Sequence, residues 1–189
     1  MGRLYLIRHG KPAAVWGGDD DDPGLDEQGA AQARAVAQVL LALPEDERPL
    51  HVVSSPLRRC RETAAPLAQA LGVEVEIDPV VGEIPTPRDL APAERPAWLR
   101  TAFAGKWSEI KGDLDYDAWR RAVAVALARR DRTAVFSHFV AINAALSVLA
   151  GDDAVIGFRP DHTSMTTLEV TDGSLRLVTR GREAATGVL

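Results

Sequence analysis

Two histidines follow short apolar runs of the chain and could carry chemistry. His9 comes after Leu4–Ile7 and Arg8, and His138 comes shortly after Thr133–Phe136. A neutral imidazole can attack phosphorus if one ring nitrogen keeps its lone pair while the other donates to a fixed acceptor. One histidine at a strand end could simply cap a loop, but two of them, one beside an arginine, favour phosphoryl-transfer chemistry.

Arginines near these histidines could bind the phosphoryl group. The guanidinium fork of Arg8 or Arg59 matches two oxygens of a phosphate. Their positive charges would also keep the imidazole of His9 neutral and stabilise the equatorial oxygens of the transition state. Gly10 leaves space for close approach of the backbone, and its N–H could be a further donor.

The segments that must position these residues alternate between short apolar runs and amphipathic stretches. We expect strands over Leu4–Ile7, Leu50–Val53, Val73–Ile77, Thr133–Phe136, Thr166–Val170 and Leu175–Thr179. We expect helices from about Asp26 to Pro44, over Leu57–Leu71 and Tyr116–Arg130, and from Phe139 to Leu149. This alternation predicts an α/β fold, a three-layer α/β/α sandwich with a mostly parallel sheet. Such sheets bind ligands at the carboxyl ends of their strands, where His9, Arg59 and His138 lie.

Residues 85–115 differ from the rest of the chain. They contain two tryptophans, little clean periodicity and the prolines Pro85, Pro87, Pro92 and Pro96. We expect residues 1–189 to form one domain in which this segment is an insertion. It would cover the pocket, exclude water and set the size of the substrate.

The composition excludes several classes of protein. The 189 residues include 22 Lys and Arg against 27 Asp and Glu, a net charge of −5 that argues against a protein built to coat nucleic acid. The single cysteine, Cys60, cannot form an internal disulfide and fits a reducing cytosol. No run approaches the ~18 uncharged apolar residues of a membrane span, and charge interrupts the N-terminal apolar run too early for a signal peptide. We therefore expect a cytoplasmic protein without a membrane or nucleic-acid partner.

Four segments carry a family resemblance, and they occur in the family's order. They are LYLIRHG at residues 4–10, LDEQGAAQA at 25–33, SSPLRRCRETA at 54–64 and VFSH at 135–138. These segments resemble motifs of the histidine phosphatase superfamily, which includes cofactor-dependent phosphoglycerate mutases and many phosphatases. The resemblance implies a phosphoglycerate mutase-like fold. It also implies a phosphatase that hydrolyses a small-molecule phosphomonoester without a metal or a cofactor.

The resemblance assigns a role to each site residue. His9 would carry the phosphoryl group transiently, and the residues that bind this group would be Arg8, Arg59, His138 and Gly10. Glu83, in the segment VGEI, matches the family's acid, which protonates the leaving oxygen and later activates water. This role needs a carboxyl whose pKa is raised by burial or by the incoming phosphate. Glu109 is the alternative acid, and Glu83 would then be a solvated loop carboxylate.

Several positions depart from the family pattern or leave their role open. Val15 stands where many members have an Asn that touches phosphate, and Phe139 stands where a Gly usually follows the second histidine. The ring of Phe139 would either narrow the pocket or turn into the helix core. Ser55 could donate to the phosphate or serve only in the turn. His162 could line the pocket wall, but a surface loop is the expected place. Cys60 is expected to be a small packed residue where the family usually has Ala.

Three other functions stay open on the residues alone. A phosphoglycerate mutase would use the same phosphoryl centre, although the extra substrate-enclosing segments of such mutases are not found. A non-catalytic module would bind a phosphorylated ligand in the same pocket. A metal hydrolase would use His9, His138 and the run Asp19–Asp22, but no metal-type spacing such as His-x-x-x-His occurs. The run Asp19–Asp22 is therefore expected to be a solvated loop.

Overall fold

One mixed β-sheet organises the molecule. The computed structural model describes residues 2–14, 20 and 22–185. Within this part of the chain the strand order is β3-β2-β4-β1-β5-β6. The strands are β1 (Gly2–Arg8), β2 (His51–Ser54), β3 (Val75–Ile77), β4 (Thr133–Ser137), β5 (Met165–Thr171) and β6 (Ser174–Thr179). Strands β3, β2, β4 and β1 are parallel, whereas β5 runs antiparallel to β1 and β6 antiparallel to β5.

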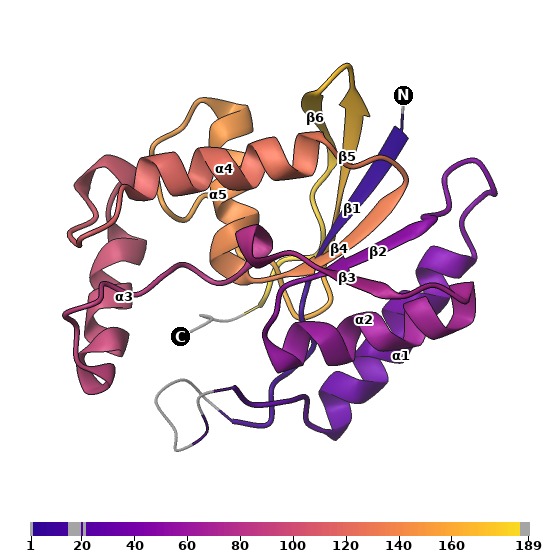
Figure 1. Cartoon of the computed structure of the whole chain (residues 1–189), viewed down its shortest axis with the longest axis horizontal. Helices are drawn as coiled ribbons and strands as arrows, with labels where there is room; N and C mark the ends of the chain where they lie inside the picture. Colours follow the sequence, from indigo (N-terminus) through magenta and orange to yellow (C-terminus); the bar gives the residue numbers. More distant parts are fainter. Residues whose placement is uncertain (1, 15–19, 21, 186–189) are drawn as a thin grey trace.

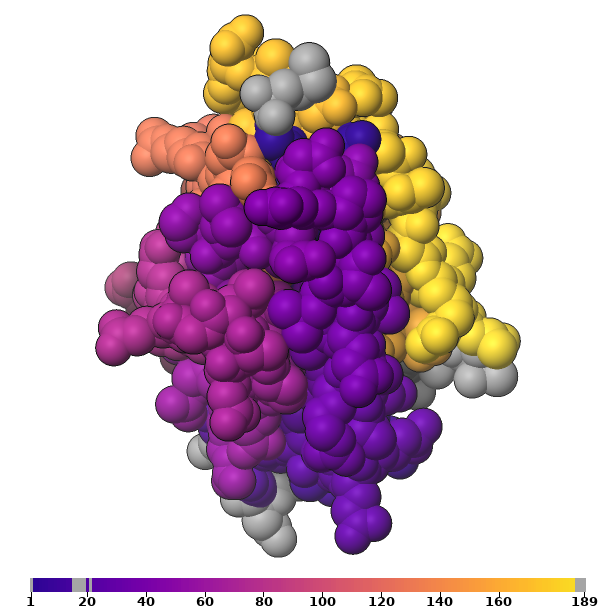
Figure 2. All heavy atoms as spheres, turned by 90° about the vertical axis from the view of Figure 1, so that its right-hand side faces the viewer, coloured from indigo at the N-terminus to yellow at the C-terminus, as the bar shows by residue number. Residues whose placement is uncertain are grey.

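Helices cover both faces of this sheet (Figure 1). They are α1 (Glu27–Leu41), α2 (Arg58–Leu71), α3 (Arg95–Ala104), α4 (Tyr116–Ala128) and α5 (Phe139–Ala150), with the short 3-10 turns η1 (Pro79–Val81), η2 (Pro92–Glu94) and η3 (Trp107–Glu109). Helices α1 and α2 pack together on one face, and Figure 2 shows their purple atoms covering that side of the molecule. Helices α4 and α5 pack together on the other face. The predicted α/β fold with its layered helices is confirmed.

The central strand β1 explains why its sequence is a continuous apolar run. Leu4 and Leu6 face the core under α4 and α5, whereas Tyr5 and Ile7 face the core under α1 and α2. Each of these side chains is at most 2% exposed. Burying such a side chain contributes about 1.5–3 kcal/mol relative to leaving it in water. A strand covered on both faces therefore shows no polar alternation.

Local signals set the ends of the helices that lead into the site. Asp26 is the N-cap of α1, and its Oδ1 accepts a hydrogen bond of 2.7 Å from the N–H of Gly29. Helices α2 and α5 end at Gly72 and Gly151, whose φ angles of 68° and 63° lie in the left-handed region that glycine adopts readily. Helix α1 ends at Leu41, a few residues before the proline that was expected to stop it.

The segment of residues 85–115 holds more regular structure than its sequence predicted. It contains α3, which lies beside the N-terminal end of α4 in Figure 1. Leu99 of α3 and Trp107 are each only 1% exposed and pack in one cluster with Tyr116 and Phe139. Only Leu99 and Ala102 of α3 are buried, so this short helix lacks the wide apolar stripe that reveals longer helices in a sequence.

The helices are too short to cross a membrane in the described part of the chain. The longest helix, α1, has 15 residues, whereas a membrane-spanning helix needs about 20 apolar residues. In the described part of the chain, no helix combines the length and the apolarity needed to cross a bilayer.

Candidate active site

The parallel strands bring the predicted residues to one edge of the sheet. His9 follows β1, His138 follows β4 as the N-cap of α5, and Arg59 lies in the first turn of α2 after β2. Because β4 lies between β1 and β2, with Arg8 opposite Ser137 in register, these strand ends are adjacent. The two histidines and two arginines are each at most 7% exposed.

The hydrogen bonds of His9 define which ring nitrogen can react. Its Nδ1 lies 2.8 Å from the carbonyl oxygen of Gly10, and a carbonyl can only accept, so Nδ1 carries the proton. Nε2 therefore holds the lone pair and accepts a hydrogen bond of 3.3 Å from Nε–H of Arg59. Burial lowers the pKa of His9 well below its usual value of 6.5, and the charges of Arg59 and Arg8 lower it further. The imidazole is neutral at physiological pH, as a nucleophile must be.

His138 is completely buried, and protein groups contact both of its ring nitrogens. Nδ1 lies 3.3 Å from Nη2 of Arg59, which can only donate, so Nδ1 is the acceptor. Nε2 then donates to the hydroxyl oxygen of Ser55 at 2.7 Å. Burial lowers the pKa of His138 well below 6.5, and His9 and Arg59 act in the same direction. Ser55 thus orients the second histidine, and its hydroxyl also accepts from the N–H of Leu57 in the turn.

Glu83 reaches the same centre from the loop after η1. Its Oε2 lies 3.6 Å from Nη2 of Arg59 and 3.5 Å from Nδ1 of His138, and its side chain is 7% exposed. Burial raises the pKa of this carboxyl, while Arg59 opposes the rise. The loop is anchored because the hydroxyl of Ser137 donates to the carbonyl of Val81 at 2.6 Å.

The alternative acid lies elsewhere. Glu109 is exposed at the end of η3 and does not line the cavity that contains His9. Of the two candidate acids, Glu83 is the one that lies near Arg59 and His138 and lines this cavity.

Arg8 presents a buried cation to this centre. Its Nη1 donates to the carbonyl of Pro160 at 2.9 Å, and its guanidinium carbon lies 5.4 Å from the ring centre of Phe139. Burial lowers its pKa to about 10, so the group stays charged at neutral pH. Among the described residues, none supplies an acceptor for its buried Nε. A phosphate oxygen bound there would satisfy a donor that is otherwise costly to bury.

Gly10 acts mainly through its backbone position. Its N–H donates to the hydroxyl of Thr63 at 2.9 Å, and this hydroxyl donates to the carbonyl of Arg59 at 2.6 Å. A phosphate oxygen would have to displace Thr63 to use this N–H. A Cβ atom on Gly10 would lie 2.8 Å from the carbonyl oxygen of Gly29, so only glycine lets the loop lie this close to α1.

A cavity of about 490 Å³ opens onto this centre. His9, Arg8 and Glu83 lie among its lining residues. A set of apolar side chains, from α3 and the start of α5, forms one wall: Pro96, Leu99, Phe103, Phe139 and Val140. The rings of Phe103 and Phe139 lie 6.0 Å apart, centre to centre. Phe139 therefore faces the cavity and narrows it.

His162 takes the less favoured of its two predicted places, the pocket wall. It was expected in a surface loop, but it lines the cavity, with its ring centre 5.7 Å from that of His9. It precedes β5, which pairs antiparallel with β1, so its loop meets the carboxyl end of β1. Recognising that β5 pairs antiparallel with β1 would have placed His162 at this edge of the sheet. In a parallel pair the residues before β5 would instead lie at the opposite edge.

The remaining expectations concern residues around the centre. Cys60 is fully buried, with Sγ 3.3 Å from Nε2 of His138, and burial raises its pKa strongly, so it is a packed thiol rather than a nucleophile. Arg58 is exposed and pairs with Glu62 at 2.7 Å. Val15 lies outside the described residues, as do two members of the aspartate run, Asp19 and Asp21.

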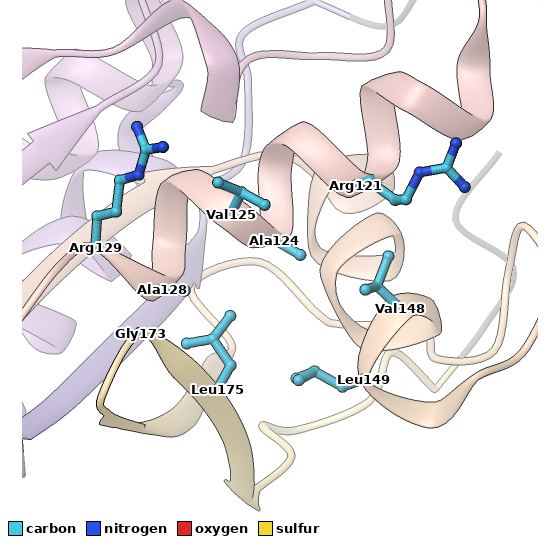
Figure 3. Close-up of a pocket in the computed structure, with 9 residues that line it drawn as sticks. All are labelled: Arg121, Ala124, Val125, Ala128, Arg129, Val148, Leu149, Gly173 and Leu175. Carbon is cyan, nitrogen blue, oxygen red and sulfur yellow. The ribbon is translucent and has the colours of Figure 1, made fainter.

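A second cavity, of about 390 Å³, lies between α4, α5 and the turn before β6 (Figure 3). Its wall is formed mainly by apolar side chains such as Val125, Leu149 and Leu175. Figure 3 shows the guanidinium groups of Arg121 and Arg129 turned away from its centre. The described residues that line it include no histidine and no carboxylate, so they cannot perform acid–base or nucleophilic chemistry on a phosphate.

Comparison with known proteins agrees with the geometry of the first cavity. The family model of the histidine phosphatase superfamily (branch 1) matches residues 4–182. The chain belongs to this superfamily. The uncharacterised protein Rv0525 of Mycobacterium tuberculosis is 34% identical in an alignment of 140 positions that covers 67% of this chain and 66% of that protein. The match thus spans slightly less than two thirds of this relative.

Solved structures share the fold over nearly the whole chain. A mycobacterial glucosyl-3-phosphoglycerate phosphatase superposes with a TM-score of 0.69 at 25% identity, covering 97% of this chain and 100% of the other. A phosphoserine phosphatase from Entamoeba histolytica, solved with 3-phosphoglyceric acid, gives 0.74 at 22% identity, covering 96% and 98%. This second likeness concerns the fold alone. The predicted family is confirmed, and its solved neighbours support a phosphoric monoester hydrolase.

Proposed function

We propose that this protein is a metal-independent phosphatase that hydrolyses a small phosphomonoester through a phosphohistidine at His9. The observation that carries the proposal is the state of His9. Its Nδ1–H is held by a backbone carbonyl, and its Nε2 lone pair faces Arg59 in a buried, cationic site. The same imidazole lines a cavity that is open to a ligand.

In the first half-reaction, Nε2 of His9 attacks phosphorus, and the bond from phosphorus to the ester oxygen breaks. Glu83, whose protonated form is favoured by burial, gives its proton to the leaving oxygen. Arg8 and Arg59 bind the equatorial oxygens and stabilise the charge that these carry in the transition state. The products are the free alcohol and a phosphoryl group on His9.

In the second half-reaction, Glu83 as carboxylate takes a proton from water. The water oxygen attacks phosphorus, the N–P bond breaks, and the lone pair returns to Nε2 of His9. Orthophosphate leaves, and Glu83 is protonated again. During both steps the dianion beside Nδ1 of His138 favours the protonated form of this ring, in which Nδ1 donates to a phosphate oxygen.

The proposal extends to the setting of the reaction. Arg8 and Arg59 supply positive charge without a metal ion, which is why we propose a metal-independent site. The apolar wall formed by α3 and Phe139 would cover the leaving alcohol and exclude water from it. The single buried cysteine fits a reducing, cytoplasmic location.

The decisive experiment compares wild type with His9→Ala on p-nitrophenyl phosphate in excess chelator. Wild type should turn over, and His9→Ala should lose activity by a factor of at least about 10³ because the proposed nucleophile is removed. Acid-labile phosphate should appear on wild type after rapid quenching. His51→Ala, which alters an exposed histidine on β2, is the matched control and should keep full activity.

Three results would count against this function. Activity retained in folded His9→Ala would exclude His9 as the nucleophile. Activity lost on chelation would replace the proposed site by a metal centre. Tight phosphate binding without turnover would make the chain a phospholigand-binding module.

A further inference from the structure

The turn of residues 162–164, before β5, is hydrogen-bonded to the backbone of Arg8 and of His9, the proposed nucleophile. The N–H of Thr163 donates to the carbonyl of Arg8 at 3.1 Å, and the N–H of Arg8 donates to the carbonyl of Ser164 at 3.2 Å. Nδ1 of His162 lies 3.3 Å from the carbonyl oxygen of His9. Three consecutive residues of the turn therefore contact the last residue of β1, Arg8, and the residue after it, His9.

This turn is held in a conformation that its sequence does not favour. Thr163 has a φ angle of +53°, which is rare for a β-branched residue because its side chain crowds the backbone. Asp161 stabilises the turn through both of its carboxylate oxygens. Its Oδ1 accepts a hydrogen bond from the N–H of His162 at 2.8 Å, and its Oδ2 pairs with Arg182 at 3.0 Å. Such strain is retained where surrounding contacts impose it, and it is concentrated at functional sites.

The consequence of this turn is the placement of the His162 ring. The carbonyl of His9 can only accept, so Nδ1 of His162 carries the proton, and Nε2 of the neutral ring is an acceptor. Among the residues that the structure describes, none makes a hydrogen bond to this Nε2. The ring lines the cavity next to His9. His138, by contrast, is fully buried, with protein partners on both nitrogens.

We propose that His162 determines specificity by accepting a hydrogen bond at Nε2 from a hydroxyl group of the leaving alcohol. The preferred substrates would then be phosphomonoesters whose alcohol carries a further hydroxyl one or two carbons from the ester oxygen. The ring centres of His162 and His9 lie 5.7 Å apart, which brings such a hydroxyl within reach while phosphorus contacts Nε2 of His9. Leu99, Phe103 and Phe139 would pack against the carbon skeleton. This inference rests on the proposed phosphatase function.

The test uses two substrates that differ by one hydroxyl group, 2-hydroxypropyl phosphate and n-propyl phosphate. Wild type should prefer the first by about fivefold or more in kcat/KM, the value of one net hydrogen bond. His162→Asn keeps a donor near the position of Nδ1 but loses the acceptor at Nε2, so the preference should fall to about one. His162→Gln places an amide oxygen near the position of Nε2 and should restore part of the preference for 2-hydroxypropyl phosphate. His51→Asn, on the exposed histidine of β2, should keep the wild-type preference.

Binding to the His9→Ala protein separates this inference from the proposed function. Calorimetry with the same two esters should show the same preference in Kd, without any turnover. If wild type hydrolyses both esters equally well, the role of His162 is overturned and the proposed phosphatase function is unaffected. If the esters differ in affinity but the protein shows no His9-dependent turnover, the proposed phosphatase function is refuted, whereas the proposed hydrogen bond to His162 is supported. Preference retained in His162→Asn would also overturn the inference.

Discussion

Replacing Glu83 with glutamine should have opposite effects on phosphate binding and on turnover. The carboxyl lies 3.6 Å from Arg59 and 3.5 Å from His138, two groups that we propose as phosphate ligands. As a carboxylate it competes with a phosphate dianion for Arg59, and as an acid it supplies the proton for the leaving group. Glutamine has the same shape but neither the charge nor the acidic proton. Glu83→Gln should therefore bind phosphate more tightly and turn over more slowly.

The distances set the size of both effects. Coulomb's law at an effective dielectric constant of about 20 gives an attraction of about 4.6 kcal/mol between Glu83 and Arg59 at 3.6 Å. This value is an upper limit for the binding free energy that phosphate loses because the carboxylate already occupies Arg59. Because burial raises the pKa of Glu83 and so favours its neutral form, a smaller gain of about 10- to 100-fold in orthophosphate affinity is expected. Loss of the acid should lower kcat on an alkyl ester by about 10²- to 10⁴-fold. The loss on p-nitrophenyl phosphate should be smaller, because that leaving group needs little protonation.

The pH profile of kcat/KM supplies an independent readout. In the proposed mechanism Glu83 acts in its protonated form, so activity should fall as pH rises through its raised pKa. His9 acts in its neutral form, and its lowered pKa places the acidic limb well below pH 6.5. In Glu83→Gln the alkaline limb should disappear and the acidic limb should remain.

Calorimetry with orthophosphate and turnover of n-propyl phosphate measure the two effects. Glu109→Gln is the matched control, because Glu109 is exposed and lies outside the cavity lining. It should change neither quantity. Weaker phosphate binding by Glu83→Gln would refute the competition for Arg59. Undiminished turnover of the alkyl ester, or an alkaline limb that persists, would refute the role of Glu83 as the acid.

Two further predictions concern other residues of the site. Cys60 should react with thiol reagents only after unfolding, because it is fully buried and burial raises its pKa; rapid labelling of the native protein would contradict this structure. Thr163→Gly should raise the free energy of unfolding by about 0.5–1 kcal/mol, since relief of the left-handed strain exceeds the entropy that glycine adds to the unfolded chain. Urea denaturation measures this change, and a stability equal to or below that of wild type would show that the turn is unstrained.

Much of the fold could be predicted from local patterns. The apolar run Leu4–Ile7 indicates a strand buried on both faces, and the helical period after Asp26 indicates α1, because both signals lie within a few neighbouring residues. Helix α3 escaped prediction because its packing partners, Trp107 and Phe139, come from later parts of the chain. A short helix stabilised by such contacts leaves no periodic trace in its own sequence.

The sequence by itself determined the chemical class of the site. Arg8, His9, Arg59 and His138 could be recognised because each lies at or shortly after the end of a strand, and parallel strands bring their carboxyl ends together. Only the tertiary structure placed Glu83, and not Glu109, near Arg59 and His138, located His162 beside His9 and assigned the ring nitrogens of His9 and His138. These features depend on strand order and on contacts between residues up to 153 positions apart. No local pattern encodes such contacts, because they form only when the whole sheet has assembled.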